Sequence, residues 1–150
     1  MAQQGFWRRV QQVLFDPVAG TTSDLESNHD KAALATLSAA GAGTTNGTDQ
    51  TNVNGRGVQV VVDITAISGT SPTLTVKVQG KDKASGKYYD LLASAALNAT
   101  GTTLLTVYPG APVTANVSAS QALPAVWRVV STVGGTSPSV TATVGASVIV

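Results

Sequence analysis

Residues 58–64 read Val-Gln-Val-Val-Val-Asp-Ile, so that an apolar side chain stands at every even-numbered position. Residues 74–78, Leu-Thr-Val-Lys-Val, continue the same alternation. A period of two predicts β-strands in which one face is buried. Residues 68–72, Ser-Gly-Thr-Ser-Pro, lie between the two stretches and form a turn sequence. The sequence therefore predicts that these two strands pair as a β-hairpin.

The same arrangement occurs a second time later in the chain. Residues 127–133 and 140–148 carry apolar side chains on one parity, and Gly-Thr-Ser-Pro recurs between them at 135–138. This pattern predicts a second hairpin and two similar halves of a sheet. The match extends little beyond the shared turn, so we favour convergent use of a good turn over a duplicated domain. Trp127 stands on the apolar parity of its strand and is expected to be a core residue.

Further short strands are predicted between the two hairpins. Residues 87–92 and 102–108 have strand character, and residues 80–86 form a charged turn ahead of them. No helical pattern of useful length interrupts this part of the chain. The sequence therefore predicts an all-β domain over residues 55–150, an antiparallel β-sandwich or a small β-barrel of about six to eight strands.

Residues 1–54 differ from the rest of the chain and are expected to form an extended, partly helical N-terminal arm with a Gly/Thr/Asn-rich linker. The apolar residues at helical spacing are Phe6, Val10, Val13 and Leu14. A helix of this length is not stable alone, so it needs a surface on its own domain, a neighbouring subunit or another protein.

The rest of the arm gives a weaker pattern. Residues 30–37 fit either one or two helical turns or a first strand. Residues 41–57 are polar and rich in Gly and Asn, as expected of a flexible linker or a long surface loop. The compact domain is therefore expected to begin near Arg56.

The composition excludes several classes of protein. The chain has no Cys, which excludes disulfides, thiolate zinc sites and thiol catalysis. The formal net charge is +1 at pH 7, so no nucleic acid and no anionic membrane is expected as a partner. No apolar run follows the first residues at the length of a secretory signal, and no transmembrane span is apparent, which fits synthesis in a cytosol.

Few residues suit catalysis or metal binding. The only His, His29, has three acidic neighbours, which lack a repeated ligand spacing and are better explained by a solvated loop or a helix cap: Asp24, Glu26 and Asp30. Three carboxylates of the predicted domain fall on separate elements, so nothing pairs them in a cleft: Asp63, Asp82 and Asp90. We therefore expect no enzyme activity, no metal and no cofactor.

Charge and exposed apolar residues suggest candidate contacts with a partner. Residues 1–30 carry a net charge of 2 − 4 = −2, and residues 56–150 carry 6 − 3 = +3. The basic turn can be a solvated hairpin end that discourages edge aggregation, or a contact for an acidic surface. The candidate contact residues are Phe6, Trp7, Arg8, Arg9, Val10 and Leu14 in the arm, and Lys81, Lys83 and Lys87 in the turn.

Tyr88 and Tyr89 are expected to point to opposite faces of their strand, with one of them exposed. A carbohydrate-binding module usually presents two or three coplanar aromatic side chains, and the sequence shows no such set. This weakens a sugar-binding function without removing it.

Several segments together resemble one family. They are Gly55-Arg56-Gly57-Val58, Val62-Asp63-Ile64-Thr65, Gly69-Thr70-Ser71-Pro72, Val78-Gln79-Gly80-Lys81-Asp82, Ser85-Gly86-Lys87-Tyr88-Tyr89, Leu105-Thr106-Val107-Tyr108-Pro109-Gly110, and the stretch from Leu123-Pro124 to Trp127-Arg128-Val129. In these residues the chain resembles the minor head and capsid decoration proteins of tailed bacteriophages. The resemblance covers residues 55–150 and consists mostly of strand and turn signatures.

The resemblance implies a structural role in the virion. It implies that the chain is made in the cytoplasm of a bacterial host, binds the major capsid protein on the outer surface of the head and stabilises the shell. It also implies a homo-oligomer, for which we expect a trimer by analogy. No catalytic or ligand residue is carried over, because the family's role is mechanical. The alternatives are a tail or fibre-associated structural protein and a carbohydrate-binding or adhesin module.

Overall fold

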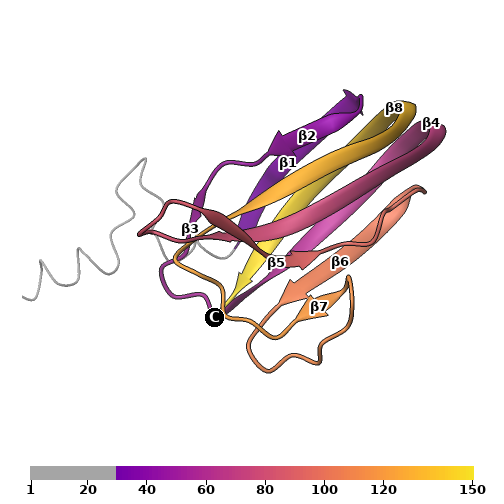
Figure 1. The fold of residues 1–150 in the computed structure, drawn as a ribbon. Coiled ribbons are helices and arrows are strands. Elements are labelled where there is room, and N and C mark those ends of the chain that lie inside the picture. The colour runs from indigo at the N-terminus through magenta and orange to yellow at the C-terminus, as the bar shows by residue number, and fades with distance from the viewer. Residues whose placement is uncertain (1–29) are drawn as a thin grey trace, which may run out of the picture.

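The computed structural model describes residues 30–150, and within that range the chain is all-β, with no helix. The predicted helix near the N-terminus lies outside the described residues. Figure 1 shows the strands, whose bounds are β1 Asp30–Ala40, β2 Gly43–Asn46, β3 Gln50–Thr51, β4 Gly57–Lys81, β5 Tyr88–Ala93, β6 Gly101–Val107, β7 Ser118–Ala119 and β8 Val126–Ile149. The prediction of an all-β domain is confirmed.

Strands β4 and β8 are the longest and pair antiparallel along almost their whole length. The first half of β4 pairs with the second half of β8, from Gly57 with Ile149 to Ser68 with Ser139. Past the two Gly-Thr-Ser-Pro segments, the second half of β4 pairs with the first half of β8. Both strands bend together at these segments (Figure 1).

The two predicted hairpins are therefore wrong in their pairing. Residues 58–64 do not pair with residues 74–78, although a turn joins them; each stretch pairs with β8 instead. The turn at 69–72 acts as a corner through which the strand continues, and 135–138 does the same in β8. A turn sequence defines a change of direction but not the hydrogen-bond partner of the strands on either side of it.

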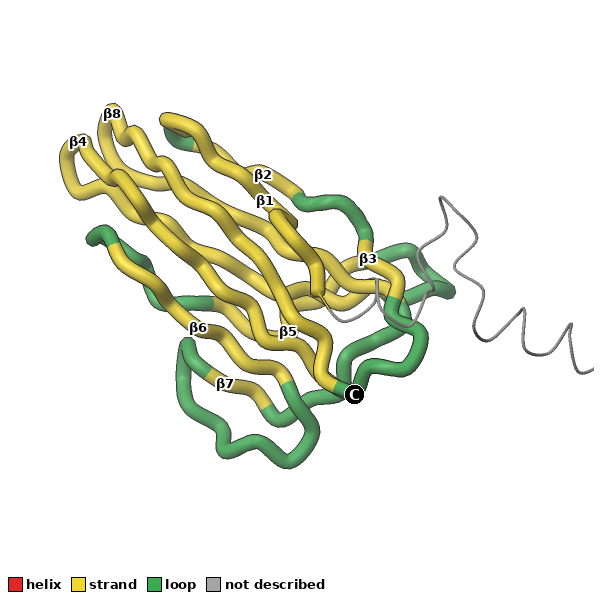
Figure 2. Tube along the Cα trace, turned by 180° about the vertical axis from the view of Figure 1, so that it is seen from behind, coloured by secondary structure: helices red, strands yellow, loops and turns green. Residues whose placement is uncertain are grey.

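The bend divides the sheet into two layers that face each other (Figure 2). The first layer holds the first half of β4 and the second half of β8, flanked by β1 on one side and by β6 and β7 on the other. The second layer holds the other halves, flanked by β2 and β3 on the β8 side and by β5 on the β4 side. Strands β6 and β7 are parallel, so the sheet is mixed rather than purely antiparallel.

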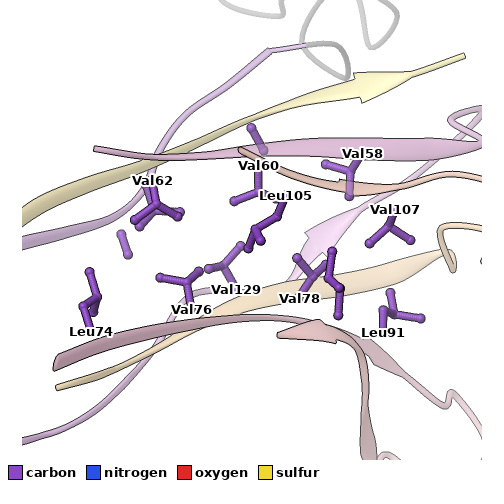
Figure 3. Packing of buried hydrophobic residues seen from close by; sticks show 14 of the residues in the cluster. Val58, Val60, Val62, Leu74, Val76, Val78, Leu91, Leu105, Val107 and Val129 are labelled. Atoms are coloured by element: carbon purple, nitrogen blue, oxygen red, sulfur yellow. The ribbon is translucent and has the colours of Figure 1, made fainter. Parts of the chain in front are cut away.

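The core lies between the two layers, where the even-numbered apolar side chains of β4 meet those of its neighbours. Figure 3 shows Val58, Val60 and Val62 of the first layer facing Leu74 and Val76 of the second. All five are almost completely buried. Burial of each such aliphatic side chain contributes roughly 1.5 to 3 kcal/mol, so this contact between the layers stabilises the domain.

Residues 30–51 belong to this sheet, which differs from the linker expected there. β1 pairs with the second half of β8, while β2 and β3 pair with its first half. Residues 30–37 thus form a first strand, one of the two predicted alternatives. Every residue of β2 is exposed, which is why residues 43–46 have the polar composition of a loop. The sheet therefore begins 25 residues ahead of residue 55, at Asp30.

The pairing registers show an internal two-fold relationship between β4 and β8. Ala35 of β1 pairs with Val144 of β8, and Leu92 of β5 pairs with Val78 of β4. The isolated bridge between Leu97 and Leu74 matches the pair of Ala40 and Val140 in the same way. In sequence order, β1, β2 and β4 correspond to β5, β6 and β8, and each set places its shorter strands on the long strand of the other. The two Gly-Thr-Ser-Pro segments therefore occupy equivalent positions in an internally repeated, strand-exchanged arrangement.

Candidate interaction surface

The turn between β4 and β5 is held by Asp82. Its carboxylate accepts hydrogen bonds from the backbone N–H of Ala84 (3.2 Å) and Ser85 (2.9 Å) and from the Ser85 hydroxyl (2.6 Å). Backbone bonds from Asp82 N–H to the Lys87 carbonyl and from Gly86 N–H to the Asp82 carbonyl close the turn. The Ser85 hydroxyl, together with the two N–H groups, holds the pKa of Asp82 below its ordinary value.

Asp49 joins this end of the domain to the link between β2 and β3. Its carboxylate accepts a hydrogen bond from the Lys81 ammonium at 2.7 Å and another from the Tyr88 hydroxyl at 2.7 Å. The bond from Lys81, followed by the bond from Tyr88, lowers the pKa of Asp49. The bond to Asp49, followed by the interaction of Lys81 with Tyr88, raises the pKa of Lys81. Both groups are therefore held in their charged forms.

The ring of Tyr88 also lies under a guanidinium group. The Arg128 guanidinium carbon is 3.5 Å from the ring centroid, and the Lys81 ammonium is 5.1 Å from it. Arg128 Nε donates to the Gln79 side chain at 3.0 Å, and Gln79 in turn donates to Asp90 at 2.7 Å. A cation on an aromatic face contributes about 0.5 to 1 kcal/mol at an exposed site.

This series of side-chain contacts ends at Lys77. Its ammonium is 2.7 Å from Asp90, and this bond, followed by that from Gln79, lowers the pKa of Asp90. The outer face of the second layer thus carries one connected group, which we call the charged cluster: Asp49, Lys77, Gln79, Lys81, Tyr88, Asp90 and Arg128.

The three predicted contact residues of the turn differ in their ion pairing. Lys81 is engaged by Asp49 inside the charged cluster, so it is not an isolated surface cation. Lys83 and Lys87 are exposed at the turn, and neither ammonium has an ion-pair partner among residues 30–150. The predicted contacts in the arm, Phe6, Trp7, Arg8, Arg9, Val10 and Leu14, lie outside the described residues.

The charged cluster and the turn together are electropositive. They carry five cations against three anions, 5 − 3 = +2: Lys77, Lys81, Lys83, Lys87 and Arg128 against Asp49, Asp82 and Asp90. The ion pairs fix the side chains, and the lysines of the turn leave positive charge in solvent. Such a surface attracts an anionic group of a partner through an interaction that salt weakens.

Sequence reasoning missed Arg128, Asp49 and the role of Tyr88. The signal for half of the cluster was present, because Lys77, Gln79 and Lys81 share the outward parity of one strand. No local pattern brings Asp49 to them, since it comes from a segment that gave no strand signal.

The aromatic predictions agree with the structure. Trp127 is completely buried in the core. Tyr89 is 45% exposed, whereas Tyr88 is half-buried under Arg128. Within residues 30–150 the indole N–H of Trp127 and the hydroxyl of Ser131 are the two buried side-chain polar groups without a hydrogen-bond partner.

Residues 30–150 contain no group of three or more His, Cys, Asp or Glu side chains placed to hold a metal ion. They also contain no helix with the length and apolar character needed to cross a membrane. Asp24, Glu26 and His29 lie outside this range. Comparison with protein-family models, with curated proteins and with solved structures gave no match.

Proposed function

We propose that the chain is a non-enzymatic structural protein of a tailed-bacteriophage virion that binds the outer surface of the assembled head and stabilises it. The proposal starts from the resemblance of residues 55–150 to capsid decoration proteins. Its partner would be the major capsid protein. We also infer that the two facing layers constitute a β-sandwich, the rigid domain that such a role requires.

The observation that carries the proposal is the continuity of β4 and β8 through both layers. Each of these strands, 25 and 24 residues long, contributes to the first layer and to the second. A force applied to one layer is therefore transmitted to the other by the covalent chain and by the ladder that joins the two strands. This is a suitable construction for a domain that resists strain without disulfides.

The electropositive end provides a contact for the shell. Lys83 and Lys87 have no ion-pair partner in the described part of the chain, and the bonds between Asp82 and Ser85 hold the backbone of their turn. Little further ordering of that backbone is needed when the two lysines meet an acidic surface. The arm residues would add apolar contacts to an adjacent subunit of the shell or to a sister copy. Many such contacts, repeated over the head, stabilise the assembled form because they bind it in preference to free subunits.

The test uses heads that lack this protein. We expect the purified full chain to co-sediment with them to saturation and to raise the temperature at which they rupture. A chain that stays in the supernatant would overturn the proposal, as would one that binds isolated tails and not heads. Binding to a glycan array that is lost in Tyr89→Ala would favour the adhesin alternative.

A further inference from the structure

The internal two-fold relationship permits a position-by-position comparison of the outer faces of the two layers. The pair of Val78 and Leu92 corresponds to the pair of Val144 and Ala35, so Val78 corresponds to Val144. The next residue of each strand then corresponds as well, which relates Gln79 to Gly145. Arg128 pairs with Gln79, and Val61 pairs with Gly145. Val61 of the first layer therefore occupies the position that Arg128 occupies in the second.

The neighbour of this position differs in the same way. In the second layer, the segment of β2 and β3 runs beside β8. Gly47 of this segment is bonded to Val129, and Gln50 is paired with Trp127. Asp49 lies between these two contacts and therefore comes next to Arg128. In the first layer β6 runs beside β4, and Leu104 pairs with Val61. Where one face has Asp49 and Arg128, the other has Leu104 and Val61.

The first-layer face has few charged residues: Asp63 on β4 and, by its pairing with Ser147 at the start of β1, Asp30. Its outward side chains include many hydroxyl groups: Thr36, Ser38, Thr65, Thr102, Thr106, Thr141 and Thr143. Asp63 accepts a hydrogen bond from the Thr102 hydroxyl at 3.2 Å. At its centre Val61 is 39% exposed and Leu104 is 45% exposed. Exposed aliphatic side chains at the centre of a hydroxyl-rich rim have the composition of an interface core.

The two halves of the domain also differ in the link that follows β6. The link from β3 to β4 is five residues long, 52–56, whereas the corresponding link from β6 to β8 spans 108–125 and includes β7. The longer link is ordered: the Thr106 N–H donates to the Val117 carbonyl and the Val117 N–H donates to the Thr114 carbonyl. It presents Val113 at 76% exposure and Val117 at 48%. Both departures from the two-fold relationship thus add exposed aliphatic side chains near β6.

We propose that this face, centred on Val61 and Leu104 and edged by the 108–117 loop, is the contact between two copies of the chain. A second copy presents the same exposed aliphatic centre, so it can cover Val61 and Leu104 without leaving a polar group unpaired at that centre. The proposal does not depend on binding to heads, and it assigns two copies rather than the three that the resemblance implied.

The available area agrees with a dimer. Four strands at about 4.8 Å spacing and seven residues at about 3.3 Å each give a face of roughly 450 Å². With the loop included, the contact between two copies reaches the ~1,000 Å² that a specific interface requires.

Sedimentation velocity of the full chain from about 1 to 100 µM tests the proposal. We expect a dimer for the wild type, and a monomer for Leu104→Glu and for Val61→Glu, because two glutamates would then face each other across the contact. Thr75→Glu, at an outward position of the second layer, is the matched control and should remain dimeric. Urea unfolding confirms that each variant is folded before its mass is compared.

A monomeric or trimeric wild type would overturn the proposal, as would a dimer that both glutamate variants leave intact. A monomer in which Leu104→Glu accelerates tryptic cleavage at Arg8 and Arg9 would instead assign the face to the chain's own N-terminal segment, and would equally overturn the contact between copies.

Discussion

Thr70 of β4 and Thr136 of β8 are cross-strand partners at the centre of two identical Gly-Thr-Ser-Pro segments. Each segment packs against the other: Gly69 lies against the backbone of Ser137, and Gly135 lies against the backbone of Ser71. The two copies of the tetrapeptide therefore have the same structural role. Each one bends its long strand from one layer into the other.

Substitution of either corner glycine is expected to destabilise the domain. Gly69 and Gly135 have φ of 120° and 112°, and an added Cβ would lie 2.7 Å from a backbone oxygen of the opposite corner. We expect Gly69→Ala and Gly135→Ala each to lower the free energy of unfolding by about 2 to 4 kcal/mol, measured by urea titration. Gly41→Ala is the control, because nothing lies within 4 Å of its added Cβ. Equal stability of Gly69→Ala and Gly41→Ala would show that the corner is not tightly packed.

Two buried serines give opposite expectations on replacement by alanine. The Ser131 hydroxyl is buried without a hydrogen-bond partner, so Ser131→Ala should raise the free energy of unfolding by about 1 kcal/mol. The Ser94 hydroxyl accepts from Val76 N–H at 3.0 Å and donates to the Ala95 carbonyl at 2.7 Å, so Ser94→Ala should lower it by about 1 to 2 kcal/mol. Urea unfolding of both variants checks the pair, and a loss of stability in Ser131→Ala would mean that its hydroxyl is bonded.

The three aspartates Asp49, Asp82 and Asp90 predict a loss of stability in acid. Their pKa values are lowered from 3.8 by bonds that exist only in the folded chain. Below 3.8 the unfolded chain therefore takes up protons that the folded chain does not, and the stability that these groups provide is lost as the pH falls through their folded values. The melting temperature should fall below pH 3.8 more steeply in the wild type than in a triple variant with Asn at these positions. Parallel curves for the two chains would contradict this, and added salt should reduce the difference because the groups are exposed.

The free lysines of the turn should affect binding to heads and not folding. If the chain is a decoration protein, Lys83→Gln and Lys87→Gln should each weaken binding to heads about fivefold, with less dependence on salt, because one charged contact of about 1 kcal/mol is lost. Neither should change the urea midpoint, since both ammonium groups lack an ion-pair partner among the described residues. Arg56→Gln removes the same charge elsewhere and is the control. Equal effects of all three substitutions would indicate that only net charge matters.

Local periodicity was enough to predict strand character and the buried faces of residues 58–64 and 74–78, because their alternation directly reflects burial against the opposite layer. It did not predict that both stretches belong to one continuous strand. It was not enough to predict the pairing, since residues 68–72 can close a hairpin or turn a corner. β2 escaped detection for a physical reason: all of its residues are exposed, so no alternation marks it.

The candidate surface was predictable only in part. The basic turn was apparent from Lys81, Lys83 and Lys87, which are close in sequence. The contacts of Asp49 and Arg128 depend on strand pairings between distant segments, and these follow from the topology rather than from any local pattern.

Electron cryo-microscopy of intact virions, compared with virions that lack the chain, tests the proposal that the chain is a decoration protein of a phage head. We expect density of the size of this two-layered domain at repeated positions on the outer surface of the head, absent from the virions without the chain. Unchanged heads, with the difference density confined to the tail, would contradict the claim.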